Sequence, residues 1–372
     1  MRTTTLFAII ITILLMNLHC TDGTKPSCPD NAFTWDSLPP IPDNTGFAGS
    51  FAGISNGVMI VAGGANFPNG GAPWKPGSVK TWYNKVFVLE KFGRNWCEAG
   101  QLPMPLGYGV SASVPDGLII AGGSNEHGHT DKVYKLRWQG GALQIDSLPS
   151  LPFTLANTSG AVAGHYLYIA GGLQSADSTA TSLAFLQLDL NALGDGWRQL
   201  PHWPGPSRML AVAGAVDDRF YLFSGTQLVD GKRQYLTDAY VYSTAEGWKI
   251  LPPLPHSVVA APSPAYTTPN GQLLIVGGDD GVLAPKAGEL KEQHPGFSDA
   301  VLVYNTKENR WHTGGKIMTR KETDAVEHPN NSVWAPVTTT LVQWEGRLVL
   351  PGGEVRPATR TPRVLVGVPC GQ

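Results

Sequence analysis

One repeat constrains this sequence more than any other feature. A short apolar segment that ends in a pair of small residues, usually two glycines, recurs six times along the chain. The pairs begin at Gly63, Gly122, Gly171, Ser224, Gly277 and Gly352. Four of the five intervals between them are 49 to 59 residues long, and the fifth is 75. A period near 50 residues is typical of the kelch blade, in which each repeat folds into one small sheet.

The neighbours of each pair describe four short strands per repeat. A tight turn such as Asn56-Gly57 or Asp116-Gly117 precedes the Gly-Gly strand, and such pairs suit two-residue hairpins. A third strand follows, and a fourth opens with a tryptophan in four repeats and usually ends in Leu-Pro. With 44 glycines, 30 prolines and 15% charged residues, the composition also favours short strands over long helices. The sequence therefore predicts an all-β fold, a six-bladed kelch-type β-propeller.

The last blade lacks a fourth strand. Residues 334–343, 347–351 and 362–368 supply its first three strands, and the chain then stops. Residues 33–39 read as a fourth strand with no blade before it. Pairing this N-terminal strand with the last blade closes the ring and removes the exposed sheet edges. We therefore expect residues 28–372 to form a single six-bladed propeller.

The N-terminus resembles an export signal. Arg2 precedes an apolar run that ends by Leu18, which is too short to span a bilayer comfortably. We expect residues 1–23 to be a signal peptide and predict no transmembrane span. In an alternative, the signal ends before Cys20, which then carries lipid. Either reading predicts an exported protein: periplasmic, envelope-attached or secreted.

The propeller topology predicts one disulfide. Cys370 follows the third strand of the last blade, and Cys28 precedes the strand that should complete it. Because these strands run antiparallel, the two cysteines should meet as a Cys28–Cys370 bridge that locks the ring. The alternative is two unrelated thiols in frayed termini. Cys97 lies within a predicted strand, and we expect a buried, unpaired thiol there.

The composition excludes several classes of partner. The net charge is −2 and no basic run is present, so nucleic acid is not expected. The sequence has no Cys-x-x-Cys and no His-x-x-x-His pattern, so we predict no metal and no cofactor. His127 and His129, on a loop, read as solvated histidines. Asp279-Asp280 reads as an acidic turn, with calcium binding as the alternative.

Candidate site residues gather in two sets of loops that share one face of a propeller. One set follows each Gly-Gly strand, and the other joins consecutive blades. Acids, amides and arginines lie there together, so we expect a small, polar, anionic ligand. The candidate substrate-binding residues are Asn66, Phe67, Tyr108, Asn125, Arg208, Gln227 and Arg356, with Glu126, Gln174, Arg320 and Lys321 on the same loops.

The densest cluster is residues 352–363. Glu354 follows a rigid strand end and is well placed as a general base. Nearby arginines, among them Arg356 and Arg360, would bind an anion through paired N–H donors and keep the carboxylate ionised. The alternative is that Glu354 forms a structural salt bridge with one of these arginines.

These residues carry a resemblance to a known family. Residues 51–65 followed by 80–83, residues 107–111, and residues 353–361 resemble the kelch-type N-acetylneuraminate epimerases, or sialic acid mutarotases. The order of blades is similar to the cyclically permuted branch, since the Gly-Glu segment comes last here. The resemblance implies interconversion of the α and β anomers of N-acetylneuraminate without a cofactor. It implies Glu354 as the general acid/base, Arg360 as the site arginine and a basic role for Arg356. The bacterial enzyme of this family has an arginine where this chain has Leu106. This difference affects the inference about substrate specificity more than the inference about reaction type.

Other functions fit this sequence less well. A non-catalytic propeller that binds glycan or protein is the main alternative to an isomerase. A copper radical oxidase needs a cysteine–tyrosine cross-link and two metal-binding histidines, which have no match here. The repeated Ser-x-Asp-x-Gly-x-Thr-Trp turns of hydrolytic sialidases are also missing. The oligomeric state is not readable from the sequence.

Overall fold

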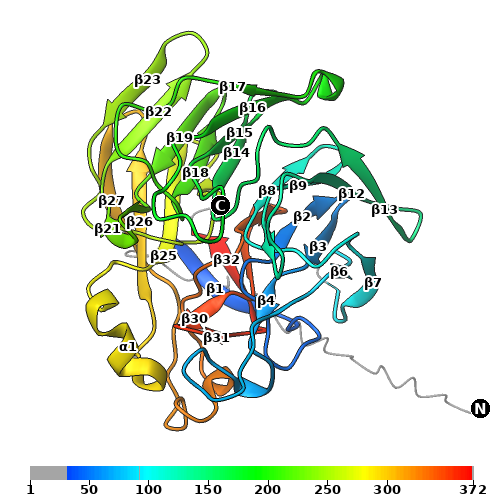
Figure 1. Ribbon diagram of the computed structural model, residues 1–372, viewed down its shortest axis with the longest axis vertical. Coiled ribbons are helices and arrows are strands. Elements are labelled where there is room, and N and C mark those ends of the chain that lie inside the picture. Colours follow the sequence, from blue (N-terminus) through cyan, green and yellow to red (C-terminus); the bar gives the residue numbers. More distant parts are fainter. Residues whose placement is uncertain (1–31, 92, 371–372) are drawn as a thin grey trace, which may run out of the picture.

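Six four-stranded antiparallel sheets surround a central axis in the computed structural model, which describes residues 32–91 and 93–370 (Figure 1). Their strands, in chain order, are β2 (Phe51–Ser55), β3 (Val58–Ala62), β6 (Lys85–Leu89) and β7 (Cys97–Gln101); β8 (Val110–Val114), β9 (Gly117–Ala121), β12 (Val133–Gln139) and β13 (Ala142–Leu148); β14 (Ser159–Ala163), β15 (Tyr166–Ala170), β16 (Phe185–Asp189) and β17 (Trp197–Gln199); β18 (Val212–Val216), β19 (Arg219–Phe223), β22 (Ala239–Ser243) and β23 (Gly247–Leu251); β24 (Tyr266–Thr267), β25 (Gln272–Gly278), β26 (Ser298–Asn305) and β27 (Arg310–Lys316); β28 (Val342–Trp344), β29 (Arg347–Pro351), β32 (Val364–Pro369) and β1 (Phe33–Leu38).

Short hairpins and helical turns lie in the connections between the strands of the sheets. The hairpins join β4 (Ala65–Asn66) to β5 (Thr81–Trp82), β10 (Ser124–Asn125) to β11 (Gly128–His129), β20 (Thr226–Val229) to β21 (Lys232–Tyr235) and β30 (Glu354–Arg356) to β31 (Thr359–Arg360). The helical turns are α1 (Ala287–Leu290), η1 (Pro68–Gly70), η2 (Leu193–Asp195), η3 (Ala284–Lys286), η4 (Lys291–Gln293) and η5 (Pro329–Asn331). None of the helices among the described residues is long and apolar enough to cross a bilayer.

The predicted closure of the ring is confirmed. β1 pairs antiparallel with β32, from Phe33 opposite Pro369 to Leu38 opposite Val364. The Cys370 N–H donates to the Ala32 carbonyl at 2.9 Å, which continues the pairing. Cys370 is disulfide-bonded, but its predicted partner Cys28 lies outside the described residues, as do residues 1–23 and the lipidation site Cys20.

Two details of the strand prediction were wrong. Cys97 is exposed and unpaired rather than buried, because β7 is the outermost strand of its blade. The first strand of the last blade begins at Val342 rather than at Trp334. The residues before it instead run along the mouth of the propeller, where the Val337 N–H donates to the Glu354 carbonyl at 2.8 Å.

The repeated tryptophans and Leu-Pro pairs link neighbouring blades. The indole N–H of Trp197 donates to the Pro149 carbonyl of the preceding blade at 3.0 Å. The same bond recurs from Trp96 to Pro39, from Trp248 to Pro201 and from Trp311 to Pro252, at 2.8 to 2.9 Å. Apolar side chains fill the space between each pair of sheets, as where Phe51 and Ile60 meet Leu118 and Ile120. The inner strands are thus buried on both faces, which explains their unbroken apolar sequences.

A ring of six backbone hydrogen bonds surrounds the propeller axis. Each blade contributes one residue, and its N–H donates to the carbonyl of the ring residue from the preceding blade at 2.7 to 2.9 Å. The bond from the Gly49 N–H to the Thr338 carbonyl closes the circle. All six have φ between +49° and +68°, a region that costs non-glycine residues energy and persists where the surroundings impose it. The ring consists of Gly49, Tyr108, Asn157, Leu210, Ala260 and Thr338.

Candidate active site

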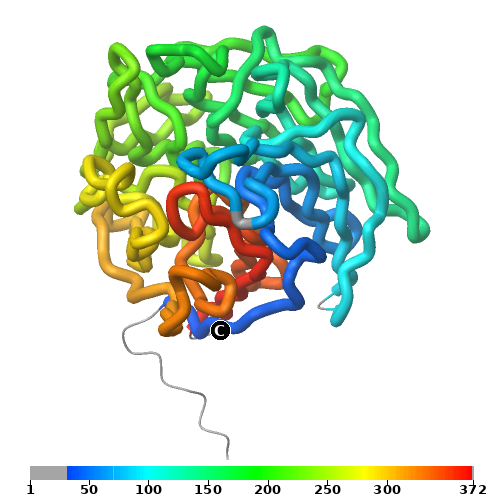
Figure 2. Tube along the Cα trace, turned by 60° about the horizontal axis from the view of Figure 1, so that its bottom comes forward, coloured from blue at the N-terminus to red at the C-terminus, as the bar shows by residue number. Residues whose placement is uncertain are grey.

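A cavity of about 720 Å³ opens above this ring, and both predicted sets of loops line it. The hairpin β30–β31, the segment that leads to Lys80 and the turns around α1 gather at this end of the axis (Figure 2). Five ring residues form its floor and also line a smaller space of about 80 Å³ beneath. The charged residues of the wall are Lys80, Arg233, Asp279, Glu354 and Arg360. The volume suits one small polar molecule.

The hairpin β30–β31 brings Glu354 and Arg360 together. Its register places Glu354 opposite Arg360. The Ala358 N–H in the turn donates to Glu354 Oε1 at 2.8 Å, which fixes the carboxylate. Glu354 Oε2 lies 3.6 Å from Arg360 Nη2, and the Glu354 side chain keeps 19% of its surface exposed. One carboxylate oxygen is therefore anchored by the backbone while the other faces the cavity beside a cation.

Arg360 has unused donors. Its side chain is only 4% exposed and lies over the Phe67 ring, 5.0 Å from the ring centroid. Nη2 donates to the Tyr108 hydroxyl at 3.4 Å, but Nε and Nη1 have no hydrogen-bond partner within the described residues. Burial opposes the guanidinium charge, yet Glu354 and Tyr108 together hold the pKa of Arg360 above its ordinary value. A buried, permanently charged group with free donors is suited to an anionic ligand.

Tyr108 connects this pair to the floor. Its φ of +62° is imposed by the backbone ring. The Tyr108 ring lies so close to Gly49 that a Cβ there would come within 2.7 Å of ring atoms. Burial raises the pKa of Tyr108, so its hydroxyl keeps its proton while it accepts from Arg360.

Lys80 is a site residue that the loop analysis missed, although it stands in one of the stretches of family resemblance. Its Nζ lies 4.3 Å from the Trp82 ring centroid and 4.2 Å from that of Tyr108. Burial, and to a smaller extent the charge of Arg360, lower the pKa of Lys80 to about 8, while the charge of Glu354 partly offsets them. A lysine sixteen residues after the second glycine of its pair gives no signal of its own that it returns to the axis.

The opposite wall is built from the fifth blade and its neighbour. The Tyr235 hydroxyl donates to Asp279 Oδ2 at 2.7 Å, and the Gly281 N–H donates to Oδ1 at 2.9 Å. The ring nitrogen Nδ1 of His294 accepts from the Gly296 N–H at 3.2 Å, so Nδ1 carries no proton. Burial lowers the pKa of His294, which favours the neutral ring. Because Tyr235 and Gly281 donate to Asp279, both of its carboxylate oxygens already have hydrogen-bond partners.

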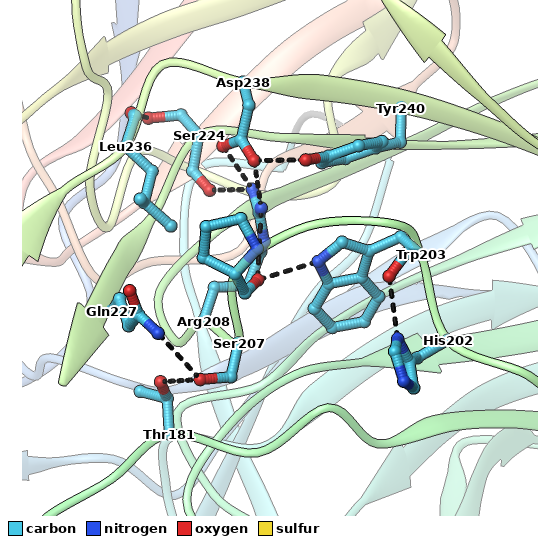
Figure 3. Close-up of polar contacts among 11 residues, drawn as sticks. Thr181, His202, Trp203, Ser207, Arg208, Ser224, Gln227, Leu236, Asp238 and Tyr240 are labelled. Carbon is cyan, nitrogen blue, oxygen red and sulfur yellow. Dashed lines mark hydrogen bonds and ion pairs between the residues drawn. The ribbon is translucent and has the colours of Figure 1, made fainter. Parts of the chain in front are cut away.

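Arg208 does not line the cavity, contrary to the sequence interpretation. It is fully buried, and its guanidinium donates to Asp238 through Nη1 at 3.0 Å and through Nη2 at 2.6 Å (Figure 3). Nη1 also donates to the Ser224 carbonyl at 2.8 Å, and the rings of Trp203 and Tyr240 lie 5.3 and 5.2 Å from the guanidinium carbon. Every direction around this charge is occupied by protein, so we assign Arg208 a structural role.

Arg356 is likewise turned away from the cavity. It is 2% exposed, and Nη1 donates to the carbonyls of Glu292 and Ala325 at 2.7 and 3.0 Å. Its guanidinium carbon lies 5.3 Å from the Trp334 ring. The register of β30–β31 shifts between Glu354 and Arg356, so their side chains do not follow the simple alternation of a strand: Glu354 lines the cavity, whereas Val355 and Arg356 pack against Trp334.

The three predicted amides also serve the scaffold. Asn66 is buried and donates to the Gly46 carbonyl at 3.0 Å while accepting from the Tyr83 hydroxyl at 2.9 Å. Asn125 donates to the Pro105 carbonyl at 3.2 Å, and Gln227 contacts Ser207 at 3.5 Å. Of the predicted set, the structure brings Glu354, Arg360 and Tyr108 to the cavity, with Phe67 directly beneath Arg360.

The fold and this cavity define a class: a six-bladed kelch propeller with a carboxylate and a buried arginine at its axial mouth. A family model described as N-acetylneuraminate epimerase matches residues 16–145 and 148–284. The chain belongs to the N-acetylneuraminate epimerase family. The Glu354 hairpin lies beyond the matched residues, so its role and the permuted order stay predictions.

Individual relatives match a shorter part of the chain. The N-acetylneuraminate epimerase of Yersinia pestis (strain Pestoides F) is 43% identical over 109 residues, which is 27% of each chain. That of Brucella suis (strain ATCC 23445 / NCTC 10510) is 35% identical over 132 residues, 32% of this chain and 34% of the relative. This chain thus spans about a quarter to a third of the curated relatives it matches. The solved "Structure of YjhT" covers 88% of this chain and 96% of its own, with a TM-score of 0.62 and 16% identity, and so supports the fold.

Proposed function

We propose that this protein is a mutarotase that accelerates interconversion of the α and β anomers of N-acetylneuraminate. The observation that carries the proposal is the Glu354–Arg360 pair, in which a backbone-anchored carboxylate meets a buried arginine with free donors. The family membership of the chain supports the substrate class. The charges of the wall suit a sugar acid, because its carboxylate needs a cation and its hydroxyls need polar partners.

The chemistry follows from these groups. Mutarotation of a hemiketal requires removal of the proton from the anomeric hydroxyl and delivery of a proton to the ring oxygen. Glu354 Oε2 takes the hydroxyl proton, while Oε1 stays bonded to the Ala358 N–H and holds the carboxylate in place. The unused donors of Arg360 bind the substrate carboxylate and keep the anomeric carbon beside Glu354. Such proton transfer accelerates reactions by about 10²- to 10⁴-fold.

The test is proton NMR of freshly released α-N-acetylneuraminate with wild type, with Glu354→Gln and without protein. The amide is isosteric and can still accept the Ala358 N–H, so the hairpin should stay folded. Glu98→Gln is the matched control, since Glu98 lies on an outer strand and pairs with Lys85 in solvent. We expect wild type and the control to speed conversion and Glu354→Gln to lose at least 100-fold. A folded wild type that matches the blank would instead favour a non-catalytic binding propeller.

We also propose that the protein is exported, on the basis of residues 1–23 alone. The mass of the mature chain recovered from fractionated cells tests this. A full-length mass in the cytosolic fraction contradicts export, and an added lipid mass identifies Cys20 as the anchor.

A further inference from the structure

Lys80 lines the cavity with its ammonium against aromatic rings rather than beside a carboxylate. Its ammonium lies against the Trp82 and Tyr108 rings, which are themselves edge-to-face at 5.5 Å between centroids. No carboxylate of residues 32–91 and 93–370 forms an ion pair with it, although thirteen other lysines and arginines do. Leaving a half-buried ammonium without a counter-ion costs stability, and such groups are typical of functional sites.

The surroundings hold this amine beside the proposed reacting groups. Tyr108 contacts Lys80 through its ring and Arg360 through its hydroxyl. Arg360 in turn lies beside Glu354. The charges that act on Lys80 are those of Arg360 and Glu354, and across the cavity it faces Arg233, Tyr235, Asp279 and His294.

We propose that Lys80 is the second proton-transfer residue of the reaction, the acid that serves the ring oxygen while Glu354 serves the anomeric hydroxyl. This role rests on the proposed function. In ring opening, the bond between the anomeric carbon and the ring oxygen breaks, and its electron pair goes to that oxygen, which takes a proton from Lys80. Glu354 takes the hydroxyl proton, and the electron pair of that O–H bond forms the ketone. In closure on the other face of the ketone, the attacking hydroxyl gives its proton back to Lys80 and Glu354 gives its proton to the ketone oxygen, so both residues regain their starting states and the cycle consumes nothing.

The other polar groups of the cavity are less suited to this step. Arg360 does not release its proton, and burial raises the pKa of Tyr108 away from neutrality. His294 is on the opposite wall and is held neutral by burial. Lys80, with a pKa of about 8, exchanges a proton readily near neutral pH. Because the protonated amine is the active form, turnover should fall as pH rises through about 8.

The test compares wild type, Lys80→Arg and Lys80→Met by NMR between pH 6 and 10, after subtraction of the uncatalysed rate. Lys132→Met is the control, because Lys132 lies on the surface beside Asp131. We expect both Lys80 variants to lose about 10²-fold or more in kcat with KM changed less than threefold, and their residual activity to lose the fall near pH 8. Arginine keeps the charge but not the exchangeable proton, so it separates proton transfer from anion binding.

Any one of several results would overturn the assignment. An active Lys80→Arg with the wild-type pH profile, or a Lys80→Met that raises KM and leaves kcat intact, would make Lys80 an anion-binding group. If turnover of Lys80→Met still falls as pH rises through about 8, the titration of another residue causes that fall. A wild type without activity refutes the proposed function and this role together, whereas an active wild type with unaffected Lys80 variants refutes the role of Lys80 alone.

Discussion

Replacing Arg208 with leucine separates its structural role from the substrate-binding role that its loop position suggested. The substitution removes both bonds to Asp238, the bond to the Ser224 carbonyl and the contacts with two aromatic rings. Breaking a buried ion pair by removing one partner costs about 3 to 5 kcal/mol. Since the Asp238 side chain is 28% exposed and can rehydrate, we expect a value near the lower limit, about 3 kcal/mol.

Urea unfolding followed by tryptophan fluorescence measures this loss, and mutarotation at low urea measures activity in the same samples. The double variant Arg208→Leu/Asp238→Asn removes the orphaned charge, so we expect it to recover part of the stability. We expect kcat and KM of the folded protein to stay within a few-fold of wild type, because Arg208 does not reach the cavity. Unchanged stability together with a large rise in KM would refute the structural assignment.

Three further predictions follow from the scaffold. Trp197→Phe removes the bond to the Pro149 carbonyl and should cost about 1 kcal/mol of unfolding free energy in the same urea assay, whereas no loss would mean that the tryptophan acts by packing alone. Gly49→Ala places a Cβ 2.7 Å from the Tyr108 ring at a φ of +68°, so it should lower both stability and kcat; wild-type kcat would show that the position of Tyr108 is unimportant for turnover. Cys370→Ser removes a disulfide and should cost about 2 to 5 kcal/mol, and an unchanged urea midpoint for oxidised wild type and variant would argue against a stabilising bridge.

The position of Arg208 in a loop predicted a substrate-binding role, but its position in the repeat indicates a buried side chain. The carbonyls of Leu106, Leu155 and Arg208 accept equivalent hydrogen bonds, from Gly64, Gly123 and Gly172 of the preceding blades. Arg208 therefore stands at a position that carries a buried leucine in two other repeats. Aligning the repeats residue by residue would have marked it as an interior side chain in need of a partner.

The ring of six blades and its closure by the N-terminal strand could be predicted from the sequence alone, which also put Glu354 and Arg360 in one short charged segment. These features depend on short-range signals, namely apolar strands and tight turns, whereas the structure adds that Glu354 and Arg360 face each other in one hairpin. Which charged side chains form ion pairs depends on the tertiary structure. Arg208 is neutralised by Asp238, thirty residues later, whereas Lys80 is carried to the axis by a loop in which the Trp74 indole N–H donates to Glu292 Oε1 at 2.8 Å, across 218 residues. Such long-range competition for partners leaves no periodic trace in the sequence, because it is settled only when distant loops meet.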